Sequence, residues 1–277
     1  MHSLQPLALV TDAAAVEMFA HGGHVARWQP RGQAPVLFVS RASRYQPGEP
    51  IRGGIPVIFP WFGDDPEGRG RSAHGFARRR LWQRVATGPN EVMYELQDDD
   101  ATLALWPHRF ALRLIVRFGA ILEVALQVSN RDDRAWRYES ALHTYLAVHD
   151  VRRVELQGLE GARFVDKAAG GVQAMQPAEP LRFTGETDRV FSRAPDTCVI
   201  DDPGLARRLV LTKSGAASTI VWNPWVEKAS RMADLRDDEW PSMLCVESGN
   251  VGSDALDLPP GGTHEMSVRI EVTSRPR

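Results

Sequence analysis

The sequence predicts an all-β protein, built from antiparallel strands with few short helices and folded as one domain over residues 1–277. Two observations favour this fold class. Apolar residues recur in short runs of about four to eight, broken by Gly, Pro, Asn or Asp, which is typical of antiparallel sheets. No composition shift or short-period repeat divides the chain, and all-β proteins of this length commonly form one domain.

Six apolar runs are the clearest predicted strands. They are Leu7–Val10, Val36–Val39, Val92–Leu96, Leu112–Phe118, Ile121–Val128 and Leu209–Thr212. Gly119 and Ala120 separate two of these runs and predict a tight hairpin, because glycine can take the positive φ that such a turn requires. Short helices are predicted at Thr11–Ala20 and Ala229–Leu235. Neither could cover a parallel sheet, so the pattern disfavours a doubly wound α/β fold.

The composition is that of an ordinary globular protein, with 43% hydrophobic and 25% charged residues. Its formal net charge of -2 gives no overall positive potential to attract nucleic acid or an anionic membrane. The run Arg78–Arg80 could bind a small anion. Cys198 and Cys245 show no metal-ligand spacing, so we expect free thiols in a reducing compartment. Met1–Val10 has no basic region followed by a long apolar run, which predicts a cytoplasmic protein.

The Gly- and Pro-rich segment Gln46–Gly75 has an apolar centre, which predicts a buried, functional loop rather than a flexible linker. Arg52 precedes two glycines, and a backbone bent sharply there against a ligand would place its guanidinium at the entrance of a site. The alternative is a structural turn with a surface arginine. His74 and Arg78 lie four residues apart around a glycine, which alone is a weak signal.

The segment Tyr138–Val148 predicts a strand that carries His143. Because side chains alternate along a strand, His143 shares its more polar face with Glu139 and Tyr145. On a concave sheet this face would form a cleft, whereas against solvent His143 would be a surface residue. A metal site shared with His149 is excluded, because six strand residues at about 3.3 Å each separate the two histidines by about 20 Å.

Glu247 follows the apolar run Met243–Val246, so we expect its carboxyl group in or beside the core. Desolvation there would raise its pKa toward that of a useful general base. The alternative is a glutamate at a strand end that faces solvent or pairs with an arginine. Trp222 and Trp225 would suit stacking against a sugar ring, although tryptophans also simply fill cores.

Six motifs, in order along nearly the whole chain, resemble the aldose 1-epimerase (galactose mutarotase-like) family, and within it the glucose-6-phosphate 1-epimerase branch. They are Arg52-Gly-Gly-Ile-Pro, Phe59-Pro-Trp-Phe-Gly, His74-Gly-Phe-Ala-Arg, Leu142-His-Thr-Tyr, Trp222-Asn-Pro-Trp and Val246-Glu-Ser-Gly-Asn. The resemblance implies a large antiparallel β-sandwich with the substrate on a concave sheet face. It also implies an isomerase that interconverts the α and β anomers of a hexose 6-phosphate.

The same resemblance implies roles for two residues. His143 would protonate the ring oxygen as the acid, and Glu247 would remove the proton of the C1 hydroxyl as the base. The ring then opens, the C1–C2 bond rotates, and reclosure gives the other anomer. This chemistry needs one acid and one base that titrate near neutrality, and no metal or other cofactor.

The substrate-binding residues also follow from the resemblance. Arg52 and Arg78 would clamp the phosphate, because forked guanidinium donors suit phosphate oxygens. His74 and Asp188 would bind sugar hydroxyls. One departure is Ala73, which stands where family members often carry a polar residue, so one substrate hydrogen bond would be missing.

Other functions remain open on the sequence. A carbohydrate-binding module could keep the fold without turnover, and a mutarotase of the same kind could take an unphosphorylated aldose. Glu247 and Asp188 could in principle act as the two carboxylates of a glycoside hydrolase. In each case we expect a monomer whose partner is a small sugar, with no nucleic acid or membrane partner.

Overall fold

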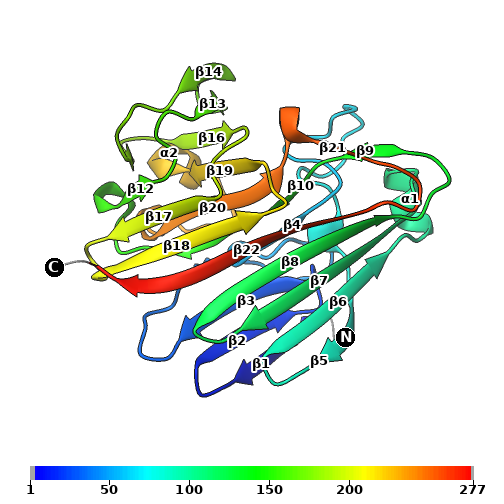
Figure 1. Ribbon diagram of the computed structural model, residues 1–277, viewed down its shortest axis with the longest axis horizontal. Coiled ribbons are helices and arrows are strands. Elements are labelled where there is room, and N and C mark those ends of the chain that lie inside the picture. Colours follow the sequence, from blue (N-terminus) through cyan, green and yellow to red (C-terminus); the bar gives the residue numbers. More distant parts are fainter. Residues whose placement is uncertain (1–3, 276–277) are drawn as a thin grey trace.

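Two large antiparallel sheets form the body of the protein (Figure 1). The computed structural model describes residues 4–275. The nine-stranded sheet has the order β15 (Leu181–Arg182), β12 (Glu155–Gln157), β17 (Thr197–Asp202), β18 (Arg207–Ser214), β22 (Thr263–Ser274), β8 (Ile121–Asn130), β7 (Phe110–Phe118), β6 (Glu91–Gln97) and β5 (Gln83–Thr87).

The eight-stranded sheet carries the residues of the predicted site. Its order is β14 (Val172–Met175), β13 (Arg163–Asp166), β16 (Thr187–Phe191), β19 (Ser218–Asn223), β20 (Met243–Asn250), β10 (Ser140–Leu142) and β4 (Val57–Ile58), and β11 (Tyr145–Ala147) also pairs with β20. Smaller sheets are made by β1 (Pro6–Val10), β2 (Ala14–Phe19) and β3 (His24–Pro30), and by β21 (Leu256–Leu258) with β9 (Trp136–Tyr138).

A shared hydrophobic core joins the two large sheets. Val221 and Val246 of the eight-stranded sheet belong to the same buried cluster as Leu122 and Val268 of the nine-stranded sheet. Each large sheet therefore buries one face against the other, and the predicted antiparallel sandwich is confirmed. This core also supports the proposal of one domain, whose ends at 1–3 and 276–277 lie outside the described residues.

Helices are short in the described part of the chain. They are α1 (Asp100–Leu105), α2 (Trp225–Ala229) and the 3-10 turns η1 (Ala77–Arg79), η2 (Val151–Arg153), η3 (Trp240–Ser242) and η4 (Gly252–Asp254). Within residues 4–275 no helix has both the length and the apolar character needed to cross a membrane. The same residues contain no group of three or more His, Cys, Asp or Glu side chains able to hold a metal ion.

Most predicted strands are confirmed, and both predicted helices are wrong. The predicted helix Thr11–Ala20 contains β2, whose buried side chains recur at every second residue because the strand packs one face inward. Of Ala229–Leu235 only the first residue is helical, since α2 ends at Ala229. The run Val36–Val39 makes isolated bridges instead of a continuous strand. The predicted hairpin at Gly119 joins β7 to β8, but neither Gly119 nor Ala120 takes the positive φ expected there.

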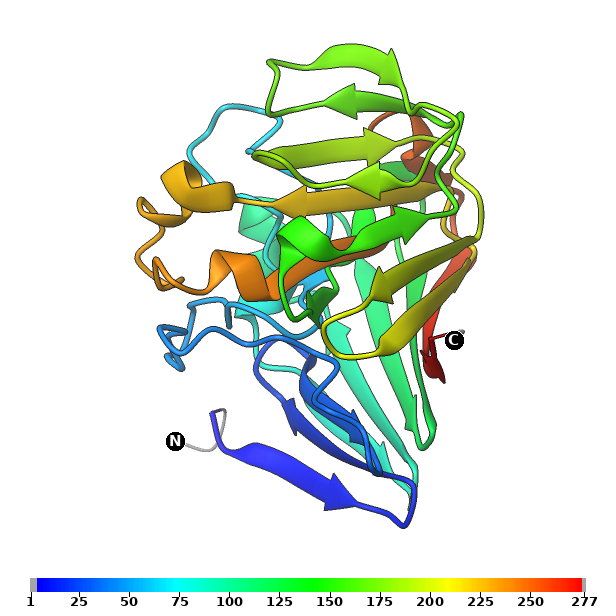
Figure 2. The same cartoon turned by 90° about the vertical axis from the view of Figure 1, so that its left-hand side faces the viewer.

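The loops that surround the site project from one side of the eight-stranded sheet. Figure 2 shows the blue-to-cyan segment 40–75 and the gold-to-orange segment 224–242 together on the left, away from β7 and β8. The first segment has a buried centre at 53–61, as predicted, and an exposed tip at 66–70. Both loops therefore flank the outer face of this sheet, opposite its packed face.

Candidate active site

His143 and Glu247 meet at the centre of the outer face of the eight-stranded sheet. His143 lies between β10 and β11, and its backbone N–H donates to Pro56 O at 3.0 Å. Glu247 lies in the middle of β20, which continues to Asn250, so it is not at a strand end. His143 Nε2 lies 3.3 Å from Glu247 Oε1, and the two residues are 6% and 1% exposed. The structure thus brings the predicted acid and base into direct contact.

Burial controls the protonation of this pair. It lowers the pKa of His143 well below 6.5, and the nearby His74 and Arg78 lower it further when charged. Burial raises the pKa of Glu247 well above 4.5, and the negative charge of Asp188 adds to this shift. Both shifts favour uncharged side chains, so one proton is shared by the pair, with Glu247 as a carboxylic acid and His143 as a neutral imidazole.

Two buried polar atoms of the pair have no hydrogen-bond partner among the described residues. They are His143 Nδ1 and Glu247 Oε2. Buried polar atoms are normally paired, because an unpaired one costs its full desolvation free energy. An unpaired carboxyl oxygen and an unpaired ring nitrogen at the same place are therefore typical of a site that holds a polar ligand.

Aromatic rings fix the orientation of the His143 imidazole. Tyr145 stacks on it with ring centroids 4.7 Å apart and planes at 10°. Trp222 and His74 meet it edge-on, at 6.1 Å and 5.7 Å. Trp222 is thus part of the wall of the site, whereas Trp225, the other tryptophan proposed for stacking, packs on Trp240 at 4.4 Å.

His74 has a defined tautomer. Its Nδ1 accepts the N–H of Gly63 at 3.2 Å, so a neutral ring carries its proton on Nε2 and can donate it. Burial and the positive charge of Arg78 lower the pKa of His74 to about 2, which keeps the ring neutral. His74 and Gly75 both take a positive φ, of 64° and 67°, and a side chain at Gly75 would collide with Phe59 O. This bend sets the position of the imidazole.

Arg52 is already held by two partners. Its Nη1 donates to Tyr145 Oη at 2.9 Å, and its Nη2 pairs with Asp234 Oδ2 at 2.9 Å. Arg78 donates from Nη2 to Ala73 O at 2.9 Å, and its Nε has no partner among the described residues. Burial, followed by repulsion from Arg52, lowers the pKa of Arg78 to about 10. The two guanidinium groups are therefore close enough to interact.

Asp188 belongs to the same face as Glu247. On β16 it pairs with Trp222 of β19, and Ile220, two residues before Trp222, pairs with Glu247. Since side chains two residues apart share a face, Asp188 and Glu247 lie on one side of the sheet. Burial raises the pKa of Asp188, and Lys228, with Nζ at 3.7 Å, opposes that shift.

Three further residues belong to this neighbourhood and were not predicted as site residues. Tyr145 could have been found, because the predicted strand Tyr138–Val148 places it on the same face as His143. Asp234 comes from the loop between α2 and η3, outside the six motifs. Lys167 donates its backbone N–H to Asp188 O at 2.7 Å, and its Nζ lies 5.0 Å from the ring centroid of Phe62. Neither Asp234 nor Lys167 has a signal in the sequence.

The glycine pair after Arg52 has a structural cause. Side chains at Gly53 and Gly54 would collide with the backbone at Phe38 and Val25, so the sharp bend expected against a ligand lies against the chain itself.

Arg79, whose role the sequence leaves open, donates to Gly48 O at 2.9 Å. This bond links η1 to the exposed loop before Arg52, so Arg79 is not free in the described structure to widen an anion site.

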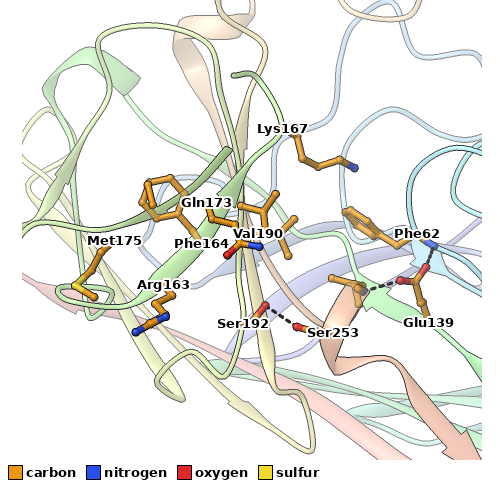
Figure 3. A pocket seen from close by; sticks show the side chains of 14 residues that line it. Phe62, Glu139, Arg163, Phe164, Lys167, Gln173, Met175, Val190, Ser192 and Ser253 are labelled. Carbon is orange, nitrogen blue, oxygen red and sulfur yellow. Dashed lines mark hydrogen bonds between the residues drawn. The ribbon is translucent and has the colours of Figure 1, made fainter. Parts of the chain in front are cut away.

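A pocket of about 800 Å³ opens over other strands of the same sheet (Figure 3). Side chains of β13, β14 and β16 line one side of it, and Phe62, Glu139 and the turn η4 line the other. His143 and Glu247 are not in its lining.

Residues 7–271 match the family described as Aldose 1-epimerase, which covers more than nine-tenths of the chain. This chain belongs to the aldose 1-epimerase family. A protein of Cenchrus ciliaris is 32% identical over 274 residues, with 94% of this chain and 81% of the relative covered. An Escherichia coli K12 protein is 33% identical over 231 residues, with 82% and 76% covered. Both relatives are provisionally named glucose-6-phosphate 1-epimerase.

Two solved structures agree with this chain in fold. A Salmonella typhimurium protein, provisionally named a mutarotase, superimposes with a TM-score of 0.91 at 28% identity. The match covers 98% of this chain and 90% of the Salmonella chain. A galactose mutarotase-like protein of Lactobacillus casei shows the same fold at a TM-score of 0.78 and 14% identity, with 97% and 100% covered. The family predicted from the six motifs is confirmed, and with it an isomerase of the aldose 1-epimerase type.

Proposed function

We propose that this protein interconverts the α and β anomers of glucose 6-phosphate, with His143 as the acid and Glu247 as the base. The observation that carries the proposal is the contact of 3.3 Å between His143 Nε2 and Glu247 Oε1 in a buried site. The ring oxygen O5 and the hydroxyl O1 of a pyranose are bonded to the same carbon. An acid and a base that act on them must therefore lie side by side, as these two groups do.

The proton count of the pair fits a reaction that opens and closes a ring. A proton first moves from the carboxyl group of Glu247 to His143 Nε2 across their contact. In the opening step His143 then gives a proton to O5 while Glu247 takes the proton of O1. The C1–O5 bond breaks and a C1–O1 double bond forms. The pair is left as neutral imidazole and carboxylic acid, the form that burial favours in both side chains. After rotation about C1–C2, the reverse transfers close the ring on the other face, so no proton is consumed.

The binding residues also fit a sugar. The neutral His74 offers a donor, and Asp188 on the same face as Glu247 offers acceptors for hydroxyl groups. Arg52 and Arg78 supply the positive charge for the 6-phosphate, in agreement with the names of the two relatives. A phosphate would share Arg52 with Asp234.

We also propose that the enzyme is a cofactor-free monomer of the cytoplasm. General acid–base chemistry needs no cofactor, and a monomer would contain both reacting side chains. Cys198 and Cys245 are free and buried, which supports a cytoplasmic location.

Anomer exchange provides the test. Magnetisation-transfer NMR on equilibrated glucose 6-phosphate should show faster α-to-β exchange with micromolar protein than with buffer alone, and the Glu247→Gln variant should remove the gain. The same measurement on free glucose separates a sugar-phosphate enzyme from a general aldose mutarotase. Binding of the sugar without faster exchange of either compound would favour the carbohydrate-binding module instead.

A further inference from the structure

The pocket beside the proposed acid and base lies on the same sheet face as they do. Its floor includes Val190 of β16, which pairs with Ile220 of β19, and Ile220 in turn pairs with Glu247 of β20. Residues paired across neighbouring strands point to the same side of a sheet. Since strands are spaced by about 4.8 Å, the pocket begins about 10 Å from Glu247 along one continuous surface.

Phe62 stands at the boundary between the pocket and the proposed site. Its ring meets the His74 ring edge-on at 4.8 Å, and it also lines the pocket. Lys167 also lines the pocket and lies next to Phe62, with Nζ 5.0 Å from the Phe62 ring centroid (Figure 3). A sugar bound at His143 and Asp188 would therefore place a substituent that extends past Phe62 in the pocket.

The lining combines an apolar floor with hydrogen-bond donors. Val190 and its cross-strand partner Val165 form part of the floor. The amide of Gln173 and the hydroxyls of Ser192 and Ser253 lie around it. This mixture is typical of pockets that bind an organic ring through its apolar face and its polar edge. At about 800 Å³ the space lies in the upper part of the usual range for small-molecule sites.

The charged side chains of the lining favour oxygen-rich ligands. Arg163 and Lys167 have no carboxylate within ion-pair distance among the described residues. The only carboxylate in the lining, that of Glu139, accepts the backbone N–H groups of Phe62 at 2.8 Å and Gly252 at 2.6 Å. The pocket therefore presents free donors and a carboxylate whose two oxygens are already bonded.

We propose that this pocket is a subsite for a second sugar ring, linked to the aldose whose anomers are exchanged. The inference rests on the proposed function, because it places the reacting ring at His143 and Glu247. It extends the substrate class from a hexose phosphate to reducing saccharides that carry a glycosyl substituent on the side away from Arg52. The apolar floor and the hydrogen-bond donors of the pocket suit a neutral sugar ring and an acidic sugar ring alike.

The test compares glucose 6-phosphate with its 2-O-, 3-O- and 4-O-glucosyl derivatives in the exchange assay. At least one derivative should exchange with a KM no higher than that of the parent. Gln173 is exposed on β14, and Gln173→Trp fills the pocket; it should raise the KM of that derivative about tenfold and change the KM of the parent less than twofold. Val172→Trp places the same side chain on β14 outside the lining and should change neither value.

Two results would overturn the subsite. One is exchange of the parent but of no derivative, and the other is a derivative whose KM does not respond to Gln173→Trp. If the parent itself fails to exchange, the proposed function has failed. Calorimetric binding of the derivative to wild type and to Gln173→Trp then decides the subsite separately, since equal affinities would reject it.

A glucuronosyl derivative identifies the kind of ring. If Arg163 takes a carboxylate, this derivative should have a KM several-fold below its glucosyl counterpart, and Arg163→Gln should remove that gain. Equal KM values for the two derivatives would assign the subsite to a neutral ring.

Discussion

Arg52 and Asp234 form an ion pair at 2.9 Å on the edge of the proposed sugar site, with side chains 19% and 21% exposed. The carboxylate comes from the loop between α2 and η3, and the guanidinium from the loop before β4. Asp234 therefore occupies one arm of the fork that we propose for the substrate phosphate. This contact links the position of a distant loop to the phosphate preference of the enzyme.

Replacement of Asp234 should strengthen phosphate binding. We expect Asp234→Asn to lower the KM for glucose 6-phosphate about three- to tenfold and to leave the KM for free glucose unchanged, because a phosphate no longer competes with a carboxylate for Arg52. Asp238→Asn in the same loop, whose partner is Arg41, is the matched control. An unchanged ratio of the two KM values would mean that the phosphate does not reach Arg52.

The arginines themselves give the complementary prediction. Arg52→Ala and Arg78→Ala should each raise the KM for glucose 6-phosphate at least tenfold, and much more than the KM for free glucose, because each removes a charge-assisted contact to phosphate. Steady-state exchange rates over a range of both sugars provide the measurement. Arg79→Ala, whose side chain bonds to Gly48 O, serves as the control. Equal effects on both sugars would make Arg52 and Arg78 structural.

The acid and the base should each be needed for exchange. We expect His143→Ala and Glu247→Gln to lower kcat about 10²- to 10⁴-fold, the usual contribution of a positioned acid or base. Thermal unfolding of each variant shows whether the fold is retained, and the exposed His149→Ala controls for the loss of an imidazole. Near-wild-type exchange in either variant would reject that assignment.

A buried histidine outside the reacting pair should make stability depend on pH. Burial lowers the pKa of His24 from 6.5 to about 3, and its Nε2 has no hydrogen-bond partner among the described residues. The contribution of neutral His24 to the stability of the fold is fully present above pH 6.5 and is lost as the pH falls toward 3. The reason is that His24 takes up a proton in the unfolded chain at a higher pH than in the folded protein. Between pH 7.5 and 4.5 this loss amounts to about 2–3 kcal/mol.

The variant His24→Met isolates this contribution. The free energy of unfolding of wild type and of His24→Met is measured with denaturant at the two pH values. On going from the higher to the lower pH, the wild type should lose more of this free energy than His24→Met, by that amount. Other titrating groups are common to both proteins and cancel in the difference. A difference that stays constant with pH would show that His24 titrates normally in the folded protein.

The sequence by itself determined the fold class and the family, and it identified His143 and Glu247 as the candidate acid and base. Short apolar runs with frequent turns identify antiparallel strands, and ordered motifs identify a family, because both are local properties of the chain. Local pattern failed at Thr11–Ala20, where pairing of β2 with β1 and β3 outweighs a weak helical preference.

Only the tertiary structure decided which distant groups surround the site. Asp234 reaches Arg52 across 182 positions of sequence, and Lys167 and Phe62 meet at the boundary of the pocket, although no motif contains either pair. Strand order, not sequence distance, sets these contacts, because β13 and β16 join the sheet beside β19 and β20. The protonation of His143 and Glu247 likewise depends on burial that the whole fold creates.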